Sequence, residues 1–555
     1  MASSPRHSAL TFPGTTFMTL MAAALVMGFS VLLPSASWAD TELLWSFAGN
    51  GSLEAIAAFP DIDGDGGPDI VFEGYGSGPS GVDHVFAVRG ASVGTGEMIW
   101  SARPLGGASS GGGSGDNCLR MGPDLNGDSF PEVLLATAWG GRTAYALNGL
   151  TGETFWSFDT YLQPQSGWVY AMDDLGSDIT GDAVPEIVIC CGSYNDRIYC
   201  LNGATSEQVW VYNGQDASLD IRSCQDINND GIRDVVAGLG DNSVPEQVIA
   251  LSGADGGLLW SRPTGGSVWN LTFVSDLDGD GIREIVPALW EGALMCINGR
   301  TGAVEWNVSA PYQQRVAPLQ DVNGDGYDDV VVGFNTSIGV RAYDGTDGTL
   351  LWTAITPDWV WAVDQVEDCT QDGIGDAVAG DFDGYMYLID GVSGETVWSW
   401  LNPTGDKIMT IRGVPDLNGN GQPDVVGGTQ LLYSPPTGGK VYAVEGNNEP
   451  MSVPELVLDQ GHGLRLSPAY PNPAHGAVSW KLGAQQGGFV QVLVIGADGR
   501  RVAELGGFRA AAGSEVGLSW NGLDRFGRPV AAGIYHTRVL LDGKLAAQGR
   551  VVQVR

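Results

Sequence analysis

The fold of this 555-residue chain is decided by the stretch Asp321-Val-Asn-Gly-Asp-Gly-Tyr-Asp-Asp329-Val-Val-Val-Gly333. Side-chain oxygens stand at its positions 1, 3, 5 and 9, glycine stands at position 6, and an apolar run follows. Oxygen ligands at alternating positions can converge on one hard cation, and glycine permits the sharp turn that wrapping requires. The valines that follow predict a buried strand. We therefore expect a cation-binding loop that leads directly into a strand.

The spacing of the oxygens favours calcium. An EF-hand loop closes with Glu at position 12 between two helices, whereas here the last carboxylate stands at position 9 and opens a strand. Magnesium is the poorer candidate, because it keeps several waters and demands a strict octahedron, while these loops offer many flexible protein oxygens. The pattern recurs eight times, so up to eight calcium ions are expected.

All eight copies lie between Asp61 and Asp424, and each runs into a stretch rich in Val and Ile. The copies that begin at Asp61, Asp276 and Asp321 follow the pattern most closely. The candidate calcium ligands are Asp61, Asp63, Asp65, Asp69, Asp124, Asn126, Asp128, Glu132, Asp178, Thr180, Asp182, Glu186, Asp226, Asn228, Asp230, Asp234, Asp276, Asp278, Asp280, Glu284, Asp321, Asn323, Asp325, Asp329, Asp368, Thr370, Asp372, Asp376, Asp416, Asn418, Asn420 and Asp424.

A second repeat lies between the loops and ends in tryptophan. Each unit of about 50 residues predicts four short strands, which is the size and content of one propeller blade. Clear copies of the turn are Asn148-Gly-Leu-Thr-Gly-Glu-Thr-Phe-Trp156, Asn298-Gly-Arg-Thr-Gly-Ala-Val-Glu-Trp306 and Asp390-Gly-Val-Ser-Gly-Glu-Thr-Val-Trp398. The tryptophans of the eight units are Trp45, Trp100, Trp156, Trp210, Trp260, Trp306, Trp352 and Trp398.

The two ends of the repeat region complement each other. Trp45 lies in Leu43-Leu-Trp-Ser-Phe47 without a preceding half-unit, and the last copy, Val441-Tyr-Ala-Val-Glu-Gly446, has no tryptophan after it. Pairing these ends in one blade would remove the open edge that otherwise invites aggregation. We therefore predict an all-β fold, with an eight-bladed β-propeller over residues 40–446. Seven blades and an open solenoid are the alternatives.

The rest of the chain divides into three segments. Residues 1–39 contain an apolar stretch and end in Ser37-Trp-Ala39, which is typical of a secretory signal peptide, although a retained membrane anchor is the alternative. Residues 447–462 form a polar, proline-containing linker. Alternating apolar residues between turn signals predict a small antiparallel β-sandwich in residues 463–555. The protein is therefore expected to be secreted or held on a bacterial cell surface.

The charge is distributed very unevenly along the chain. Residues 40–450 hold 15 Lys and Arg against 58 Asp and Glu, whereas residues 463–555 hold 11 against 5. Nucleic acids and anionic membranes require a basic face, so neither is expected as a partner of the repeat region. The clustered carboxylates repel one another without metal, and stability coupled to calcium is therefore expected.

Residues for other catalytic chemistry are scarce. His84 is the only histidine of the repeat region, so a Ser-His-Asp site, a Cys-His site or a metal site with several histidines is not expected there. A pair of carboxylates that cleaves glycosides is an alternative, because acidic residues are abundant. Some disulfides are expected in a secreted chain, and the odd count leaves at least one cysteine unpaired. The adjacent Cys190 and Cys191 end an apolar run, which a core position explains adequately. The seven cysteines are Cys118, Cys190, Cys191, Cys200, Cys224, Cys296 and Cys369.

Several aromatic residues stand outside the repeated tryptophan column. They flank predicted strand ends, where flat rings can stack on sugars or peptides, and packing between blades is the alternative. Tyr170 belongs to the same set. The candidate rim of a ligand site is Trp139, Trp168, Trp269, Trp290, Trp359 and Trp361.

Three resemblances to known families follow from these motifs. The Asp/Asn loops resemble the FG-GAP/VCBS repeats of integrin-α-like proteins, which implies a calcium-stapled scaffold for adhesion or ligand binding. The Asn-Gly-x-Thr-Gly-x-x-x-Trp turns look like blades of quinoprotein (PQQ-type) propellers, which implies an alcohol or sugar dehydrogenase, often with a vicinal disulfide beside the cofactor. Ser467-Pro-Ala-Tyr-Pro-Asn-Pro473, Gly496-Ala-Asp-Gly-Arg-Arg501 and Gly533-Ile-Tyr535 resemble the Ig-like domain of FlgD-type hook-capping proteins and the related type IX secretion sorting domain.

The sequence thus predicts a calcium-binding module that adheres to an extracellular polymer or protein ligand. Its C-terminal domain would contact the secretion or attachment machinery. No catalytic or organic-cofactor residues are assigned. The alternative is an extracellular enzyme on the same ring, either a PQQ-type dehydrogenase or a polysaccharide lyase.

Overall fold

The structure is a computed structural model, and nearly all of its regular elements are strands; Thr160–Leu162 forms a short 3-10 helix. The expected signal peptide, the expected linker and Trp139 lie outside the described residues. Among the described ranges, no helix has the length and apolar character that crossing a bilayer requires. The structure describes residues 41–75, 83–104, 117–138, 141–163, 167–193, 196–240, 246–336, 339–430, 439–446, 464–466, 474, 476–484, 488–496, 501–523, 528–530, 533–541 and 544–553.

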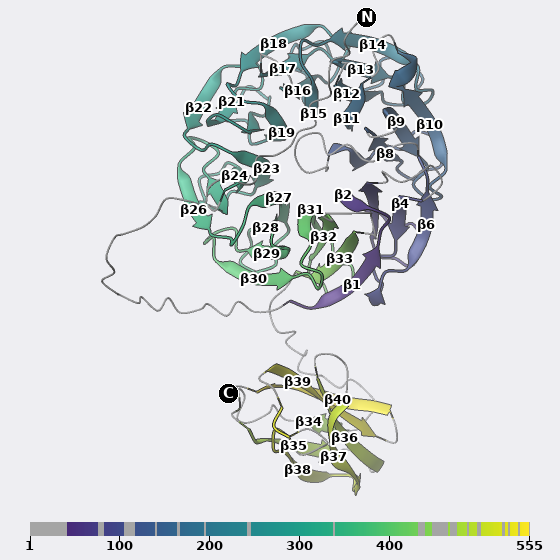
Figure 1. The fold of residues 1–555 in the computed structure, drawn as a ribbon, viewed down its shortest axis with the longest axis vertical. Coiled ribbons are helices and arrows are strands. Elements are labelled where there is room, and N and C mark those ends of the chain that lie inside the picture. The colour runs from purple at the N-terminus through teal and green to yellow at the C-terminus, as the bar shows by residue number, and fades with distance from the viewer. Residues whose placement is uncertain are drawn as a thin grey trace, which may run out of the picture. The chain divides into compact units, whose positions relative to one another are not determined.

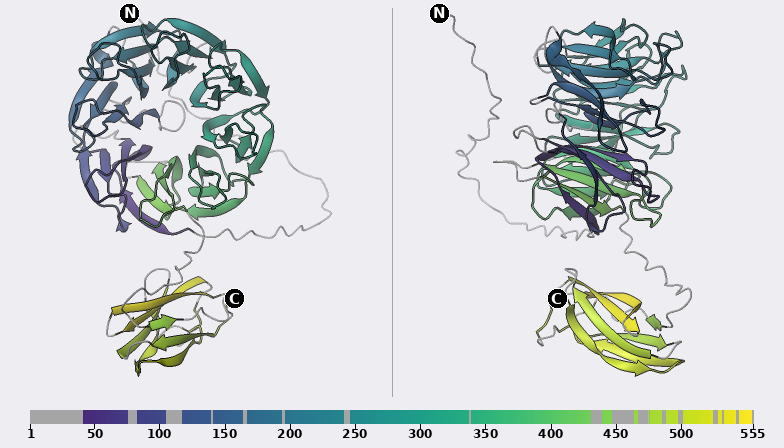
Figure 2. Two further views of the ribbon diagram at one scale, coloured as in Figure 1. Left: turned by 180° about the vertical axis from the view of Figure 1, so that it is seen from behind. Right: turned by 90° about the vertical axis from the view of Figure 1, so that its right-hand side faces the viewer.

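The described part of residues 41–446 forms eight sheets arranged as a ring (Figure 1), which is the arrangement of a β-propeller. Seven sheets have four strands, and in six of these the four strands follow one another in sequence. At successive positions around the ring, β11, β15, β19, β23, β27 and β31 lie toward the middle, and strands such as β14, β18, β22 and β26 lie outside. Figure 2 shows the same ring from behind and from the side.

The strands of the ring have the following bounds: β1 Leu43–Ala48, β2 Ser52–Phe59, β3 Asp69–Tyr75, β4 Val85–Val88, β5 Gly94–Thr95, β6 Met98–Ala102, β7 Leu119–Met121, β8 Val133–Ala136, β9 Thr143–Leu147, β10 Thr154–Asp159, β11 Trp168–Asp174, β12 Ile187–Gly192, β13 Arg197–Leu201, β14 Gln208–Asn213, β15 Ser218–Ser223, β16 Val235–Leu239, β17 Gln247–Leu251, β18 Leu258–Pro263, β19 Val268–Phe273, β20 Ile285–Leu289, β21 Leu294–Ile297, β22 Val304–Val308, β23 Gln313–Leu319, β24 Asp329–Phe334, β25 Val340–Tyr343, β26 Leu350–Ala354, β27 Val360–Val366, β28 Asp376–Asp381, β29 Tyr385–Ile389, β30 Thr396–Leu401, β31 Lys407–Val414, β32 Asp424–Gln430 and β33 Lys440–Glu445.

Burial explains the different sequence patterns of the strands. Every residue of β24 is buried, because both faces of a second strand pack against neighbouring sheets, and its sequence is almost continuously apolar. The outer strand β22 alternates and buries Trp306 among exposed neighbours. The core lies between the sheets: Val331 of one sheet and Val363 of the next belong to the same apolar cluster. Burial of such faces is the main force that holds neighbouring sheets together.

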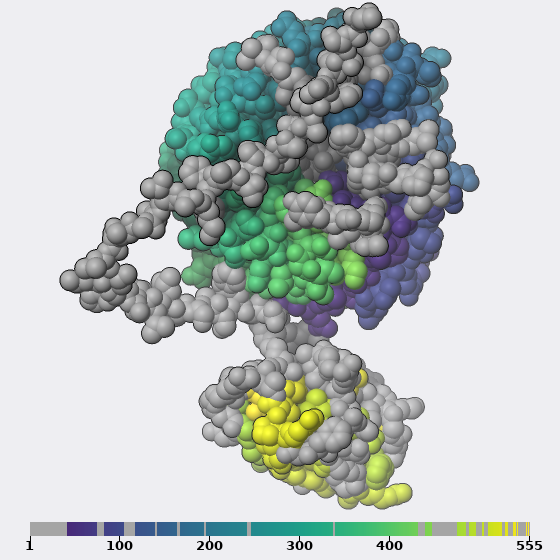
Figure 3. All heavy atoms as spheres, in the orientation of Figure 1, coloured from purple at the N-terminus to yellow at the C-terminus, as the bar shows by residue number. Residues whose placement is uncertain are grey.

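The ring closes through its first strand. Strand β1 pairs antiparallel with β33, and Trp45 lies opposite Ala443, so the closing pairing that the sequence predicts is confirmed. The short strand β5 pairs parallel with the other edge of β1. Figure 3 shows this junction from one face, where the purple N-terminal atoms meet the light green atoms of the last sheet. Strands from the two ends of the repeat region therefore share one sheet.

One hydrogen bond links each sheet to the next. The indole N–H of the repeated tryptophan donates to the carbonyl of a glycine that follows the third strand of the neighbouring sheet. The bond is repeated around the closed circle. The eight pairs are Trp45 to Gly90 (2.8 Å), Trp100 to Gly149 (2.9 Å), Trp156 to Gly203 (2.7 Å), Trp210 to Gly253 (2.7 Å), Trp260 to Gly299 (3.0 Å), Trp306 to Gly345 (2.8 Å), Trp352 to Gly391 (2.7 Å) and Trp398 to Gly446 (2.9 Å).

These glycines are required by close backbone approach. A Cβ atom on Gly345 would lie 2.0 Å from the carbonyl oxygen of Asp328, the eighth residue of the Asp321 loop. In all eight sheets the corresponding distance is between 1.8 and 2.2 Å, far inside van der Waals contact. Any larger residue would therefore push the turn away from the loop and break the link to the adjacent tryptophan.

The C-terminal strands form two antiparallel sheets, in the orders β34-β35-β38 and β37-β36-β39-β40. One apolar cluster contains buried residues from both sheets, among them Trp480, Val492 and Trp520. Alternating apolar residues predict strands at 478–481, 490–495, 516–520 and 534–539, which lie in β35, β36, β38 and β39, whereas β34, β37 and β40 were not predicted. The bounds are β34 Leu464–Leu466, β35 Val478–Ala484, β36 Gly488–Gly496, β37 Arg501–Ala510, β38 Ser514–Trp520, β39 Gly533–Leu541 and β40 Lys544–Gln553.

The substitution Trp398→Phe tests the inter-sheet hydrogen bond at the closing sheet. It keeps an aromatic ring but leaves the buried Gly446 carbonyl without its donor, so we expect the free energy of unfolding to fall by about 1–3 kcal/mol. Urea denaturation followed by circular dichroism measures this change. Trp359→Phe is the matched control, because Trp359 is 45% exposed and should change stability by less than about 0.5 kcal/mol. Equal effects of the two substitutions would contradict the role given to the bond.

Candidate metal centres and aromatic rim

The Asp/Asn loops all connect the innermost strand of a sheet to its second strand. In the loop of Asp321, Oδ1 of that aspartate accepts from the backbone N–H groups of Gly324 (2.6 Å) and Asp325 (3.0 Å), and Oδ2 accepts from Gly326 (2.8 Å). Both glycines have positive φ, 80° and 96°, a region that glycine enters without strain. The first aspartate therefore wraps the loop around itself, and the loops that begin at Asp61 and Asp276 repeat this geometry.

The ninth residue of every loop is a fully buried carboxylate. In each loop it accepts the backbone N–H of the second residue, as Asp329 does from Val322 at 2.9 Å. In the five loops that end in Asp, it also accepts the N–H of the glycine whose carbonyl binds the adjacent tryptophan; Gly345 to Asp329 is 3.1 Å. One glycine peptide thus connects the carboxylate to the next sheet. The sequence indicated these carboxylates as ligands but not this second role.

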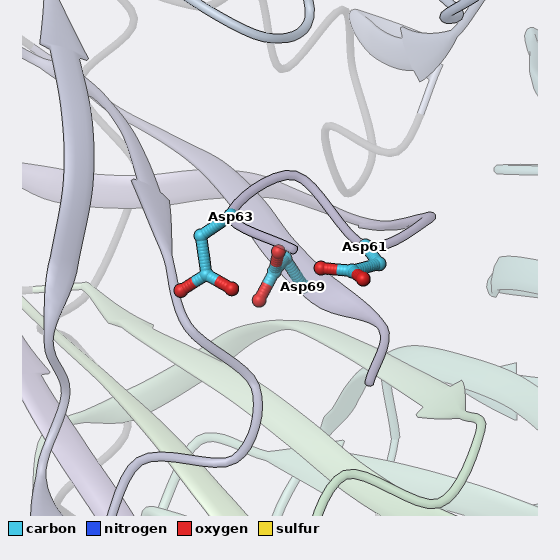
Figure 4. Close-up of side chains that lie close together, drawn as sticks. All are labelled: Asp61, Asp63 and Asp69. Carbon is cyan, nitrogen blue, oxygen red and sulfur yellow. The ribbon is translucent and has the colours of Figure 1, made fainter. Parts of the chain in front are cut away.

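Three loops bring three carboxylates together. In each, oxygens of three acidic residues lie within 4.8 Å of one another. Figure 4 shows the first group, in which Asp61, Asp63 and Asp69 converge. The groups are Asp61, Asp63 and Asp69; Asp124, Asp128 and Glu132; and Asp276, Asp278 and Glu284. In the other five loops, which lie wholly within the described ranges, no such group is found.

The donor set fits a hard cation. Within the described part of the chain, the buried Oε2 of Glu284 has no hydrogen-bond partner, although its other oxygen accepts from Leu277 at 3.0 Å. Burial, with repulsion from Asp278, Asp276 and Asp280, raises the pKa of Glu284 to about 7. A buried carboxylate oxygen beside two further carboxylates is costly unless a positive charge lies between them. Calcium prefers such all-oxygen ligand sets.

In six sheets the residue before the turn glycine pairs with the third or the fifth residue of the loop. Where the loop residue is an aspartate, the turn residue is an asparagine whose side-chain N–H donates to it: Asn202 to Asp182 (2.6 Å) and Asn298 to Asp278 (3.0 Å). Where the loop has Asn323, the turn supplies the acceptor Asp344 at 2.9 Å. The two sequence repeats therefore meet in space through complementary side chains. Both partners were visible in the sequence, but their pairing across about 20 residues was not.

Arginine occupies this turn position in one sheet. Nε of Arg89 lies 2.6 Å from Asp63 and 3.5 Å from Asp65. Arg300, one residue after its turn glycine, lies 2.7 Å from Asp280. These guanidinium groups neutralise part of the carboxylate charge in two of the three loops with grouped acids.

None of the seven cysteines forms a disulfide, so the expectation of disulfides is wrong. All seven are buried, and Cys190 and Cys191 lie side by side in the fully buried strand β12. Burial raises the pKa of both thiols. The physical reason is that these side chains fill small positions in the packed faces of the sheets. The core interpretation of the adjacent pair therefore holds.

Four of the predicted rim tryptophans form one cluster. The rings of Trp269 and Trp290 are stacked at 4.9 Å, and Trp361 meets Trp269 edge to face at 6.3 Å. Phe382, which was not predicted, stacks on Trp361 at 5.2 Å and lies 5.9 Å from Trp359. Tyr312 adds a further edge contact to Trp290. We call Trp269, Trp290, Tyr312, Trp359, Trp361 and Phe382 the aromatic cluster.

The aromatic cluster lies at the ends of strands remote from the loops. Trp269 is the second residue of β19 and lies at an irregularity in its pairing with β20, and the far end of β19, Phe273, leads into the Asp276 loop. Trp359 is 45% exposed and Tyr312 is 44% exposed. The indole N–H of Trp361 is buried and has no hydrogen-bond partner among the described residues. Trp168 lies outside this cluster, at 6.1 Å from Tyr170.

Asp381 fixes the backbone beside the cluster. It is fully buried and accepts from the Tyr387 hydroxyl at 2.6 Å and from the Tyr385 N–H at 2.8 Å. Lys407 lies 3.4 Å above the Phe382 ring, a cation–π contact. Burial raises the pKa of Asp381 to about 6.

Comparison with known proteins shows that the fold is similar to that of known β-propellers. The family described as "Outer membrane protein assembly factor BamB" (PQQ_2) matches residues 140–276 and 236–370. No curated protein matches the sequence. Quinohemoprotein alcohol dehydrogenase ADHIIG from Pseudomonas putida HK5 is 12% identical, with a TM-score of 0.51 over 73% of this chain and 76% of that one. The C-terminal WD40 domain of Sif2 is 12% identical, with a TM-score of 0.50 over 73% and 99%.

BamB from Moraxella catarrhalis is 15% identical over 73% of this chain and 98% of that one, with a TM-score of 0.45. At these identities the similar structures show the fold alone. The chain is a repeat β-propeller, and its residues 140–276 and 236–370 are similar to the PQQ_2 repeat.

The substitution Asp381→Asn tests the buried carboxyl beside the aromatic cluster. The folded pKa of about 6 exceeds the ordinary value of 3.8, so the stability that Asp381 contributes is present below about pH 4 and is lost as the pH rises through 6. The variant lacks this titration. As the pH rises from 4.5 to 7.5, the free energy of unfolding of the variant should increase relative to that of the unmodified protein, by up to about 3 kcal/mol. Melting temperatures measured across this pH range follow the change. A difference that does not change with pH would contradict the raised pKa.

Proposed function

We propose that the protein is a secreted or cell-surface binding module: an eight-bladed propeller that binds an extracellular polymer or protein ligand and is held together by calcium. The observation that carries this proposal is the partly exposed aromatic cluster, at the strand ends remote from the loops. Its residues stand outside the repeated tryptophan column, so packing between repeats does not require them. Flat rings with a free edge are typical of surfaces that stack on sugars or peptide side chains.

The buried donor of Trp361 supports a ligand at this place. An indole N–H without an acceptor costs free energy when it is buried. A ligand that stacks on Trp359 and brings a hydroxyl or carbonyl oxygen would supply that acceptor. This requirement fits a carbohydrate or a peptide better than a purely apolar partner.

Calcium has a structural role in the proposal. The first and ninth residues of each loop already bind the backbone, and in the five loops that end in Asp the ninth residue is connected to the adjacent sheet through the turn glycine. An ion in the loop would neutralise the carboxylates and strengthen this connection. The three loops with grouped carboxylates are the strongest candidates, and the other five loops are weaker ones.

The C-terminal sheets would form an Ig-like domain for export or attachment. Support comes from the two-sheet arrangement with a shared core and from the resemblance of its motifs to FlgD-type and type IX sorting domains. Residues 463–555 contain 11 Lys and Arg against 5 Asp and Glu, so this domain carries a net positive charge, whereas the ring is acidic. The domain would contact the export or surface machinery, and the ring would face the ligand.

A PQQ-type dehydrogenase is the second candidate, and the similarity to a quinohemoprotein alcohol dehydrogenase is the observation that favours it. The resemblance would place a vicinal disulfide beside the cofactor, whereas Cys190 and Cys191 are buried within β12 and form no disulfide. We therefore rank the binding module above this enzyme. A polysaccharide lyase is the third candidate, and the ligand experiment below tests it.

Calcium binding is tested by metal removal. We expect chelation to lower the melting temperature by several degrees, and calcium but not magnesium to restore it. Titration calorimetry of Asp278→Asn should show weaker binding or one site fewer than the unmodified protein. Asp255→Asn removes an equal charge from an exposed turn outside the loops and should leave the titration unchanged. An unchanged melting temperature after chelation would rule out calcium in the loops.

Ligand binding is tested on a glycan array and with immobilised surface polymers. For any ligand found, Trp359→Ala should weaken binding by at least about tenfold, the size of an interface hot spot. Tyr161→Ala is the control, because Tyr161 is 55% exposed but lies outside the aromatic cluster. Equal binding by both variants would place the ligand elsewhere. A bound chromophore after addition of PQQ with calcium, or a lyase absorbance signal, would instead establish the enzyme.

A further inference from the structure

Basic side chains converge on a cavity at the middle of the ring. The cavity, about 250 Å³ in volume, is lined by Arg222, Arg283, Arg315 and Arg412 and by one carboxylate, Asp364. Arg222, Arg315 and Arg412 come from the innermost strands β15, β23 and β31. Those strands lie around the inside of the ring in Figure 1. We call this space the central cavity.

The charge of the central cavity is opposite to that of its surroundings. Residues 40–450 contain 15 basic against 58 acidic residues, yet the lining has four arginines and one carboxylate. Asp220 and Asp328 lie behind the lining, 3.3 Å from Arg222 and 3.7 Å from Arg283. A random share of the basic residues would not produce this lining. A cleft walled by one sign of charge focuses the field and attracts small ions of the opposite sign.

Arg315 is the arginine of the four whose burial most needs an explanation. It is only 3% exposed, and burial together with repulsion from Arg412 lowers its pKa well below the ordinary value. Arg412 lies 3.3 Å from Asp364 and also donates to the Ile56 carbonyl at 3.2 Å. Two arginines thus share one carboxylate in a poorly hydrated place. Replacing such charges by apolar residues is often neutral or favourable for stability, so stability alone does not explain them.

We propose that the central cavity binds a small oxyanion through its carboxylate or phosphate group. Guanidinium groups such as those of Arg222, Arg315 and Arg412 recognise the oxygens of such a group by charge-assisted hydrogen bonds. Arg222 also donates to Asn117 at 2.6 Å and Arg412 to Asp364 at 3.3 Å, and these contacts orient the two groups at the cavity wall. The volume lies below the roughly 300–1,000 Å³ of drug-sized sites, so the ligand is a small molecule or one acidic unit of a polymer. This site is separate from the aromatic cluster and goes beyond the proposed function.

The experiment titrates the calcium-loaded full-length protein with inorganic phosphate and, separately, with D-galacturonate. Sodium chloride at equal ionic strength is the reference for screening. Saturable binding by calorimetry, with a raised melting temperature, is expected for at least one anion. Binding of phosphate alone identifies a phosphate ligand, and binding of galacturonate alone identifies a carboxylate. If neither anion binds above the chloride reference, the proposal is overturned.

Variants assign the binding to the cavity. Arg222→Gln and Arg412→Gln should each weaken the anion about tenfold or more, whereas Arg103→Gln, which removes an exposed charge outside the lining, should not. None of the three substitutions changes a loop residue, so loss of a calcium ligand does not explain a difference between the cavity variants and the control. Unchanged affinity in both cavity variants overturns the proposal.

A further variant acts in the opposite direction. Asp364→Asn removes the only carboxylate of the lining, so the anion should bind more tightly and raise the melting temperature more than in the unmodified protein. This result remains informative if an arginine variant fails to fold. A smaller increase in melting temperature than in the unmodified protein overturns the proposal. Loss of ligand binding at Trp359→Ala with intact anion binding would separate the two sites.

Discussion

The peptide of one glycine in each sheet holds the ring together. In the sheet of Gly345, its carbonyl accepts the indole N–H of Trp306 from the preceding sheet, and its N–H donates to the buried carboxylate of Asp329. Because the glycine touches the loop backbone, its position depends on the loop, and the tryptophan depends on the glycine. The geometry of the acidic loop is thus transmitted to the neighbouring sheet. The bond from Trp398 to Gly446 carries the same link into the closing sheet.

The loops and turns have adapted to each other around this peptide. The third loop residue and the residue before the glycine form a donor–acceptor pair, and the direction of that pair is reversed between Asp278 with Asn298 and Asn323 with Asp344. This reversal keeps one hydrogen bond while it changes the charge of the loop. It also explains why the loops differ in their number of carboxylates without losing their fold. The metal affinity of the loops can therefore vary from sheet to sheet on a constant scaffold.

The features that suggest function are those that depart from the repeat. The aromatic cluster and the central cavity are each built by side chains from several sheets, and neither follows the repeated pattern. The repeats supply a rigid frame, on which strand ends and innermost strands present different side chains in each sheet. Ligand recognition on such a frame needs only local substitutions, because the links between sheets lie on the outer strands and the loops.

The sequence by itself determined the repeated unit and its closure. The loop pattern, the tryptophan column and the incomplete ends at Trp45 and Gly446 are local or periodic signals. They predicted about four strands per unit and the pairing of the two ends, which β1 and β33 form. Four of the six tryptophans predicted from their departure from the period lie in the aromatic cluster. These signals are readable because each depends on residues close together in the chain.

Only the tertiary structure decided which residues meet across the ring. Arg222, Arg315 and Arg412 lie far apart in sequence and carry no shared motif, so their convergence depends on the closed circle of innermost strands. Phe382 joined the aromatic cluster, and the expected disulfides were absent because the cysteines fill positions in packed sheet faces. The pairing of loop and turn side chains likewise became visible only when two repeats lay in contact. Such contacts arise from the packing of whole sheets, which local sequence patterns do not encode.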